Sequence, residues 1–302
     1  MKKNLIVIAG PTAVGKTALS IELAKLYKCP VISADSRQFY KEMSIGTAKP
    51  TPEEMQDVPH YFIDNINIHD TYNVGQFERE AIECIENLFK ENDQLILVGG
   101  SGLYINAILN GVDEFEEIPS HIREQLIKDF EDKGLIYLQE QLKLKDEVYY
   151  NQVDLNNPQR MMRALEVCIH NNKPYSSFRT KEKKTRSFEN INILINTDRE
   201  ALYNRINKRV DIMMQNGLLE EVKSLYPYKH LNALNTVGYK EIFDFIDNKC
   251  TLEEAINLIK QNSRRYAKRQ LTWFNHQGDF ETFEPTDLEK LKAYLDIITQ
   301  YL

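Results

Sequence analysis

The chain has few of the residues that crosslink a protein or anchor it in a membrane. Only four cysteines occur among 302 residues, and none forms a C-x-x-C pair with another. This spacing suggests neither a zinc site nor a disulfide framework, so we expect a reducing compartment, the cytoplasm. No apolar run approaches the roughly 18 residues that a membrane-spanning helix needs. We therefore expect no membrane partner.

Positive charge is also in short supply. Lysine and arginine total 38 against 45 acidic residues, a net charge of −7, which by itself argues against a nucleic-acid partner. The basic residues nevertheless gather in three groups: Arg160 and Arg163; Lys181, Lys183, Lys184 and Arg186; and Arg264, Arg265, Lys268 and Arg269. Each group could be a solvated face or could bind an anionic partner.

One motif indicates a chemistry. Residues 10–17 fit G-x-x-x-x-G-K-[ST], the phosphate-binding loop, and consist of Gly10, Pro11, Thr12, Ala13, Val14, Gly15, Lys16 and Thr17. Residues 5–9 read as a buried strand before the motif and residues 18–26 as an amphipathic helix after it. In that context backbone N–H groups and the helix N-terminus face phosphate oxygens, Lys16 adds a full charge, and the Thr17 hydroxyl can bind Mg²⁺. The motif predicts a diphosphate or triphosphate ligand and leaves ATP and hydrolysis open.

Alternating strands and helices predict the fold class. Short apolar strands at 31–33, 61–63 and 95–98 and a helix at 74–91 indicate an α/β fold, a P-loop NTPase-like parallel sheet flanked by helices. Helical patterns at 121–133, 135–143 and 158–171 dominate the middle of the chain. We therefore predict a catalytic core of residues 1–111 and 191–302 with an inserted helical subdomain at 112–190.

The phosphate motif lacks the partner expected in a nucleotide hydrolase. Such enzymes hold Mg²⁺ with an aspartate at the end of a second strand, but the strand at 95–98 runs into Gly99 and Gly100. The nearest carboxylate is expected to be Asp35, at the carboxyl end of another strand, where ligands of parallel sheets bind. Asp35 is a candidate general base, or else a helix cap or turn residue.

Two arginines are candidates for phosphate contacts. Arg205 and Arg209 lie four residues apart on a predicted helix, so both could reach one phosphate. The alternative is a surface ladder of salt bridges with Asp198 or Glu200.

Longer stretches of the chain resemble the bacterial tRNA dimethylallyltransferase family, also called tRNA isopentenyltransferases. The resemblance covers essentially the whole sequence, and Ser101 stands where the family usually has threonine. The stretches that carry it are GPTAVGKT at 10–17, ADSRQFYKEMSIGTAKPT at 34–51, VPHYFID at 58–64, VGGSGLY at 98–104, NNPQRMMRALEV at 156–167, TVGYKEI at 236–242 and RRYAKRQLTWF at 264–274.

The resemblance implies a reaction and roles for residues. Dimethylallyl diphosphate would transfer its prenyl group to N6 of adenosine-37 in a tRNA, with Mg²⁺ as cofactor and a monomeric enzyme. Asp35, Thr17 and Arg209 would be catalytic, Thr17 would bind the metal, and residues 10–17 with Arg205 and Arg209 would hold the diphosphate. The anticodon stem-loop would be contacted by Asp35, Ser36, Arg37, Gln38, Ser101, Arg123, Gln159, Arg160, Met161, Met162 and Arg163.

Two other functions remain open at this point. A small-molecule P-loop kinase would place ATP on residues 10–17 and an acceptor hydroxyl on Asp35. A non-enzymatic RNA-binding protein with a nucleotide-sensing core would bind RNA and form no covalent product.

Overall fold

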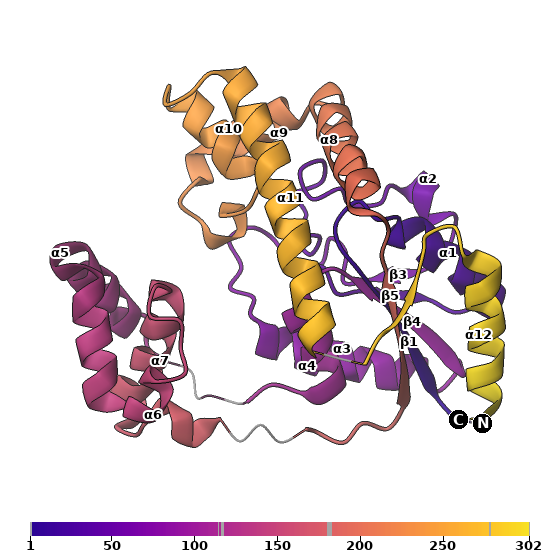
Figure 1. The fold of residues 1–302 in the computed structure, drawn as a ribbon, viewed down its shortest axis with the longest axis horizontal. Helices are drawn as coiled ribbons and strands as arrows, with labels where there is room; N and C mark the ends of the chain where they lie inside the picture. The colour runs from indigo at the N-terminus through magenta and orange to yellow at the C-terminus, as the bar shows by residue number, and fades with distance from the viewer. Residues whose placement is uncertain (1, 114, 116–117, 180–182, 278, 302) are drawn as a thin grey trace. The chain divides into compact units, whose positions relative to one another are not determined.

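The computed structural model describes residues 2–113, 115, 118–179, 183–277 and 279–301. The chain forms two compact units, a larger one of Met1–Leu109 with Thr185–Leu302 and a smaller one of Asn110–Lys184 (Figure 1). The smaller unit was expected at 112–190, but Thr185 onward belongs to the larger unit. No helix among the described residues has the length and apolar character needed to cross a membrane.

A six-stranded parallel sheet forms the centre of the larger unit, in the order β3-β2-β4-β1-β5-β6. The strands are β1 (Asn4–Ala9), β2 (Val31–Ser33), β3 (His60–Tyr61), β4 (Gln94–Gly99), β5 (Glu189–Ile195) and β6 (Glu281–Phe283). The predicted α/β fold with a parallel sheet is confirmed. The strand expected at 61–63 ends early because Phe62 has a left-handed backbone, with φ of 62°, which a strand cannot contain.

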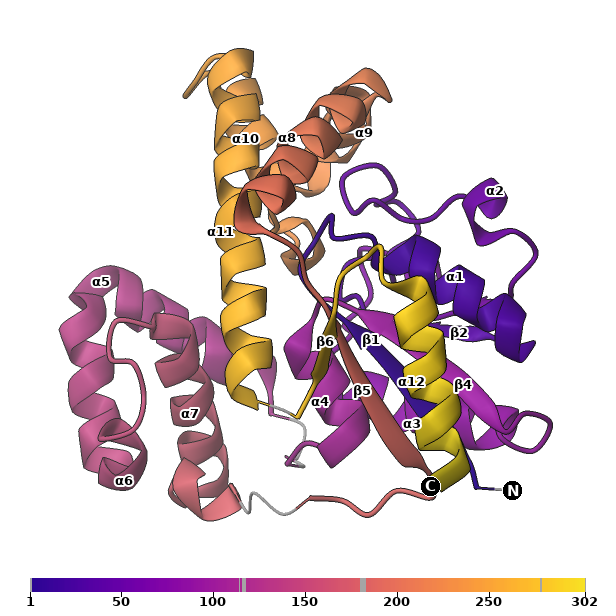
Figure 2. The same ribbon diagram turned by 45° about the vertical axis from the view of Figure 1, so that its right-hand side comes forward.

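Helices cover both faces of this sheet (Figure 2). The helices of the larger unit are α1 (Lys16–Tyr27), α2 (Pro52–Met55), α3 (Val74–Leu88), α4 (Gly102–Asn110), α8 (Arg199–Gln215), α9 (Leu218–Leu225), α10 (Tyr239–Ile246), α11 (Leu252–Gln277) and α12 (Leu288–Tyr301), with 3₁₀ turns at Tyr226–Tyr228 and Asn232–Leu234.

Side chains of β1 alternate between two cores. Leu5 and Val7 pack with α3 and α4, whereas Ile6 and Ile8 pack with α1, α8 and α12. Helices α8 to α11 enclose a third core, which includes Val222, Tyr239 and Ile259.

The smaller unit is helical, as its sequence predicts. It contains α5 (Ser120–Lys145), α6 (Glu147–Tyr150), α7 (Pro158–Asn171) and a 3₁₀ turn at Tyr175–Phe178. Gly134, with φ of 75°, interrupts α5 where the sequence separates two helices. Helix α7 begins as predicted: Asn157 Oδ1 accepts a hydrogen bond from the Arg160 N–H at 3.2 Å, and Pro158 takes the first helical position.

Arg186 contacts the segment by which the chain leaves the larger unit. Its Nε and Nη2 donate to the carbonyls of Ile108 and Ala107, both at 2.8 Å, and Nη2 pairs with Glu78 at 2.8 Å. The two charged side chains are only 12% and 5% exposed. Grouping Arg186 with the accessible basic residues was therefore wrong, because its charge is neutralised inside the larger unit.

We expect Arg186→Met to lower the free energy of unfolding by about 3–5 kcal/mol, the usual cost of removing one partner of a buried ion pair. Chemical denaturation monitored by circular dichroism measures this change. Lys249→Met is the control: Lys249 is 61% exposed and pairs with Asp244 and Asp247, so its loss should lower stability by less than about 1 kcal/mol. Equal stability of the Arg186 variant and the wild type would contradict the assignment.

Candidate active site

Three loops meet at the carboxyl edge of the sheet. They are the phosphate loop (residues 10–17) after β1, the Asp35 loop (residues 35–38) after β2, and the glycine loop (residues 99–102) after β4. A cavity of about 250 Å³ opens beside them in the larger unit. It is lined by Thr12, Ala13, Asp35, Ser36, Arg37, Gly46, Thr47, Ala48, Ile206, Arg209, Val210, Met213, Thr236, Val237, Gly238, Ile259, Ser263 and Tyr266.

The phosphate loop has the strand, turn and helix context that the motif requires. Gly10 adopts φ of 153°, and a Cβ there would lie 2.4 Å from the carbonyl oxygen of Ile195, so only glycine fits. Lys16 begins α1 and donates from Nζ to the Pro11 carbonyl at 2.7 Å. Burial lowers the pKa of Lys16 to about 7, with nearby Asp35 acting against that shift and Arg209 adding to it. An anion bound in the loop would favour the protonated amine.

Both candidate arginines of α8 contact the phosphate loop. Arg205 Nη1 donates to the Val14 carbonyl at 3.1 Å, and Arg209 Nη1 donates to Thr12 Oγ1 at 3.3 Å. Only Arg209 lines the cavity, where burial lowers its pKa against the opposing effect of Asp35. Asp198, one of the two acids expected in the alternative ladder, instead caps α8 by accepting from two backbone N–H groups.

Asp35 is a turn residue that also faces the cavity, and its role as a general base stays a prediction. Its Oδ1 accepts from the Arg37 N–H at 3.0 Å, which makes it a turn residue, and it also lines the cavity. Next to it, Ser101 Oγ accepts from the Ser36 N–H at 3.3 Å and lies 3.2 Å from Ser36 Oγ. Tyr266, on α11, hydrogen-bonds Ser101, and burial raises the pKa of its phenol to about 12. The cavity thus holds one carboxylate beside several hydroxyl groups.

Arg37 and Gln38 support the cavity wall, a role that their sequence pattern does not reveal. Arg37 Nη1 donates to the carbonyls of Asn232 and Ala233 at 3.1 and 3.0 Å. Gln38 Nε2 donates to the carbonyls of Thr47 and Ala48 at 3.3 and 3.2 Å, and its Oε1 accepts from Ser33. Both side chains were proposed as tRNA contacts, yet each is already bound to the protein backbone.

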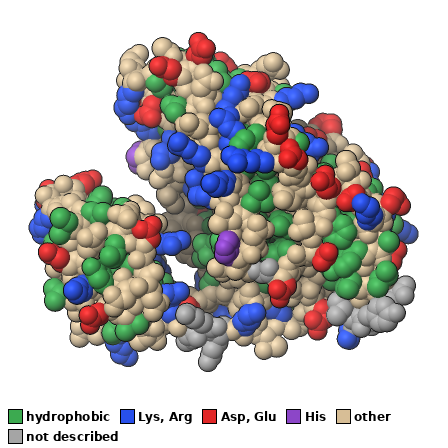
Figure 3. Space-filling model, in the orientation of Figure 1, with side chains coloured by type: hydrophobic (Ala, Val, Ile, Leu, Met, Phe, Trp, Pro, Cys, Tyr) green, Lys and Arg blue, Asp and Glu red, His purple; other side chains and the backbone are tan. Residues whose placement is uncertain are grey.

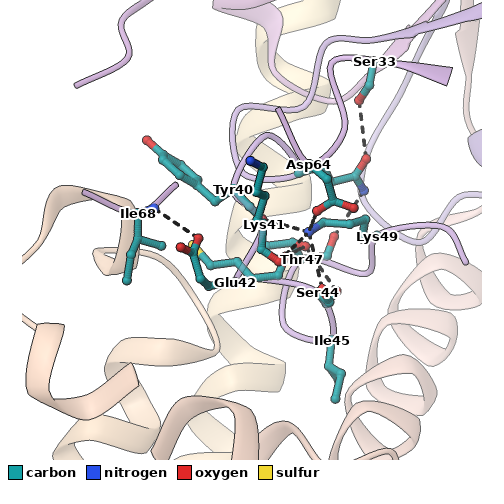
Figure 4. Close-up of polar contacts among 12 residues, drawn as sticks. Ser33, Tyr40, Lys41, Glu42, Ser44, Ile45, Thr47, Lys49, Asp64 and Ile68 are labelled. Atoms are coloured by element: carbon teal, nitrogen blue, oxygen red, sulfur yellow. Dashed lines mark hydrogen bonds and ion pairs between the residues drawn. The ribbon is translucent and has the colours of Figure 1, made fainter. Parts of the chain in front are cut away.

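The segment from Ser44 to Lys49 forms one wall of the cavity and is held at both ends. Lys49 Nζ donates to the Tyr40 carbonyl at 2.8 Å and pairs with Asp64 (Figure 4). Glu221, from α9, accepts from the N–H groups of Ser44, Ile45 and Gly46 at 3.0, 2.7 and 3.0 Å.

The same carboxylate accepts from the Tyr239 hydroxyl at 2.6 Å. A Cβ at Gly46 would lie 2.5 Å from the Tyr239 ring, so this contact requires glycine. Sequence reasoning missed Glu221; the only signal for it is indirect, through the glycine of IGTAKPT and the tyrosine of TVGYKEI.

The candidate tRNA contacts of the smaller unit differ in accessibility. Met161 and Met162 are 0% and 2% exposed in the core formed by α5 and α7, so their side chains are covered by the protein, and only their backbone is left to bear out the predicted tRNA contact. Gln159, Arg160 and Arg163 are exposed on α7. Glu166 pairs with Arg123 at 2.7 Å and with Arg163 at 3.3 Å, and Arg123 also bonds Gln159. The Arg163 guanidinium lies 5.2 Å from the centre of the Phe115 ring.

Lysine and arginine side chains gather over α11 and the neighbouring α8 (Figure 3). Arg264 bonds Asn207 at 2.5 Å, whereas Arg265, Lys268 and Arg269 are exposed on α11. Of the predicted lysine run, Lys183 is exposed, and Lys181 lies outside the described residues.

The pKa of Lys16 predicts how diphosphate binding depends on pH. Because the amine loses its proton near pH 7 and only its charged form attracts the anion, the dissociation constant for inorganic diphosphate should rise about tenfold per pH unit above 7. Titration calorimetry from pH 6 to 9 measures it. Lys16→Arg is the control, because its guanidinium stays charged over this pH range. The ratio of the two dissociation constants at each pH removes the effect of the ionisation of diphosphate itself. Parallel profiles would show that Lys16 keeps its proton throughout.

Comparison with known proteins identifies the family. Residues 38–277 match the model of the IPP transferase family. The chain is 52% identical over 300 residues to a tRNA dimethylallyltransferase of Flavobacterium johnsoniae and 46% identical over 292 residues to tRNA dimethylallyltransferase 1 of Bacteroides thetaiotaomicron. These alignments cover 97% of this chain and 97% and 95% of the relatives.

Solved structures agree with this assignment. The full-length tRNA isopentenylpyrophosphate transferase of Bacillus halodurans superposes with a TM-score of 0.72 at 36% identity, covering 98% of this chain and 96% of that one. A eukaryotic dimethylallyltransferase acting on tRNA superposes with a TM-score of 0.82 at 28% identity, covering 99% and 80%. With its phosphate loop, cavity carboxylate and full-length similarity, the chain belongs to the IPP transferase family.

Proposed function

We propose that this protein is a tRNA dimethylallyltransferase. It transfers the dimethylallyl group of dimethylallyl diphosphate to N6 of adenosine-37 in tRNA and releases diphosphate. The observation that carries the proposal is one cavity lined by Thr12 of the phosphate loop, by Arg209 and Asp35, and by an apolar wall. The names of the full-length relatives support the same activity.

The donor matches the cavity in both charge and polarity. Lys16, Arg209 and the loop N–H groups would stabilise the negative charge that develops on the departing diphosphate. The apolar lining residues, Ile206, Val210, Met213, Val237 and Ile259, suit a branched prenyl group, which needs no polar partner. This wall favours a prenyl diphosphate over ATP.

Magnesium fits the residues at the phosphate loop. No cluster of three or more His, Cys, Asp or Glu side chains suited to a metal occurs among the described residues, and Mg²⁺ bound to phosphates typically needs few protein ligands. The Thr17 hydroxyl, in the first turn of α1, would be one ligand. When bound, the ion would neutralise charge on the diphosphate.

Asp35 is the proposed base on the acceptor side. The N6 lone pair of adenine is delocalised into the ring, so the nitrogen attacks only as its proton is withdrawn. The bond from N6 to the prenyl carbon forms, the bond from that carbon to the diphosphate oxygen breaks, and the proton passes to the carboxylate. The base must leave the anticodon-loop stack to reach the cavity. We also propose that the enzyme is a monomer and acts in the cytoplasm.

One assay tests this function against its rivals. The protein is incubated with labelled dimethylallyl diphosphate, ATP and unmodified tRNA, and the RNA is examined for label. We expect label in the anticodon loop. ATP turnover stimulated by a small acceptor would instead identify a kinase, and RNA binding with no covalent product would identify a binding protein.

We expect Asp35→Asn to lower the transfer rate by about 10²–10⁴, the range for loss of a general base, while tRNA affinity is retained. The amide can still accept from the Arg37 N–H, so the turn should persist. Single-turnover transfer and filter binding measure the two quantities. A rate within about threefold of wild type would leave Asp35 as a turn residue only.

We expect Arg209→Ala to reduce the transfer rate by about 10²–10³, the usual loss for one well-placed donor to a developing negative charge. Arg205→Ala is the matched control on the same helix. It should cost less, because Arg205 bonds a carbonyl of the loop and does not line the cavity. A larger loss for the Arg205 variant would reverse the assignment of the two arginines.

A further inference from the structure

We propose that Gln270, on α11, is a positioning residue that sets the spacing between the donor and acceptor halves of the active site. The inference rests on the proposed function. Gln270 lies outside the set of cavity-lining residues, so it would act through the groups that it holds and not by touching a substrate.

The Gln270 amide joins two of the active-site loops. Its Oε1 accepts from the Thr12 N–H of the phosphate loop at 2.9 Å, and its Nε2 donates to the Gly100 carbonyl of the glycine loop at 2.8 Å. The residue is only 7% exposed. A primary amide provides an acceptor and donors on one short planar group, which matches the N–H on one side and the carbonyl on the other.

Glycines in the facing loop allow this close approach. A Cβ at Gly100 would lie 2.3 Å from Gln270 Nε2, and a Cβ at Gly102 would lie 2.3 Å from the ring of Trp273, one turn further along α11. Helix α11 therefore packs directly on the backbone of the glycine loop. In such close packing, a shift of Gln270 would move the backbone that it holds.

Hydrogen bonds on each side extend the connection to groups with proposed roles in the reaction. On the donor side, Thr12 Oγ1 accepts from Arg209. On the acceptor side, Gly100 precedes Ser101, whose Oγ accepts from the N–H of Ser36, the neighbour of Asp35. Gln270 thus connects the loop that accepts from Arg209 with the loop that contacts the neighbour of Asp35.

This placement predicts an effect on rate more than on binding. Each substrate keeps its own contacts when Gln270 is changed, but the two reacting atoms lose their fixed separation. A misplacement of about 1 Å between reacting groups can cost about 10² in rate. A purely structural role would instead lower stability and weaken both substrates together.

Three variants of the full-length protein test the proposal. Gln270→Met keeps the length of the side chain and removes both hydrogen bonds. Gln270→Glu keeps an acceptor for the Thr12 N–H but places a carboxylate against the Gly100 carbonyl unless it is protonated. Gln261→Met, on the exposed side of the same helix, is the control. For each we would measure single-turnover transfer at saturating substrates, the dissociation constants of inorganic diphosphate and of tRNA, and the melting temperature.

We expect Gln270→Met to slow saturated transfer by about 10–100-fold with both dissociation constants within threefold of wild type, and Gln261→Met to match the wild type. The deficit of Gln270→Glu relative to wild type should shrink as the pH falls from 8 to 5.5, because the protonated acid can donate to Gly100.

Transfer by Gln270→Met within threefold of wild type, or equal losses in rate and in both affinities, would overturn the proposal. If Gln270→Met fails to fold, a rate deficit of Gln270→Glu that stays constant from pH 8 to 5.5 would also overturn the proposal. Absence of transfer by the wild type would refute the proposed function itself, which keeps the two failures distinct.

Discussion

Desolvation of positive charge is the constraint on which this active site depends. The Lys16 amine and the Arg209 guanidinium are both withdrawn from water, which lowers the pKa of each, and Asp35 acts against both shifts. Burying charge costs free energy unless a partner compensates for it. The free protein supplies part of that compensation through Asp35 and the Pro11 carbonyl, and the proposed diphosphate would supply the rest. The same carboxylate that balances these cations is the proposed base, which links donor binding to acceptor activation.

Close packing between helices and loop backbone fixes the geometry around these charges. Gly100 and Gly102 admit α11, and Gly46 admits the Tyr239 ring from α10. In each case a side chain of α10 or α11 packs against loop backbone in the N-terminal part of the chain. The cavity wall is therefore assembled by contacts distant in sequence, such as that from Glu221 to Ser44, 177 residues apart. The stability of helices α8 to α11 and the geometry of the cavity wall therefore depend on the same contacts.

The sequence predicted what local patterns encode. Alternating apolar strands and the motif at residues 10–17 predicted the parallel sheet and the phosphate loop, because both depend on residues close together in the chain. Gln270 and Glu221 escaped notice because their hydrogen-bond partners lie far away in the sequence, and no local pattern marks a polar side chain that makes such contacts. The burial of Met161 and Met162 was missed for a related reason: the family motif contains them, but their side chains pack in the core of the smaller unit. Roles of the site residues in catalysis and tRNA binding stay predictions.

The distribution of charge bears on how a protein of net charge −7 would hold an RNA. Several cations in the predicted basic groups are already engaged: Arg186 with Glu78, Arg264 with Asn207, and Arg163 with Glu166. A phosphate of the RNA would have to compete with those partners for the cation. RNA affinity depends on the counterions released from each phosphate that the protein neutralises. Arg265 and Lys268 on α11 and Arg160 on α7 are exposed and form no ion pair with another described residue. Arg269, also exposed on α11, lies 5.8 Å from the centre of the Tyr266 ring. A small set of exposed cations would therefore dominate affinity, while recognition of the target base would depend on the Asp35 side of the cavity, because phosphate contacts position an RNA without specifying its sequence.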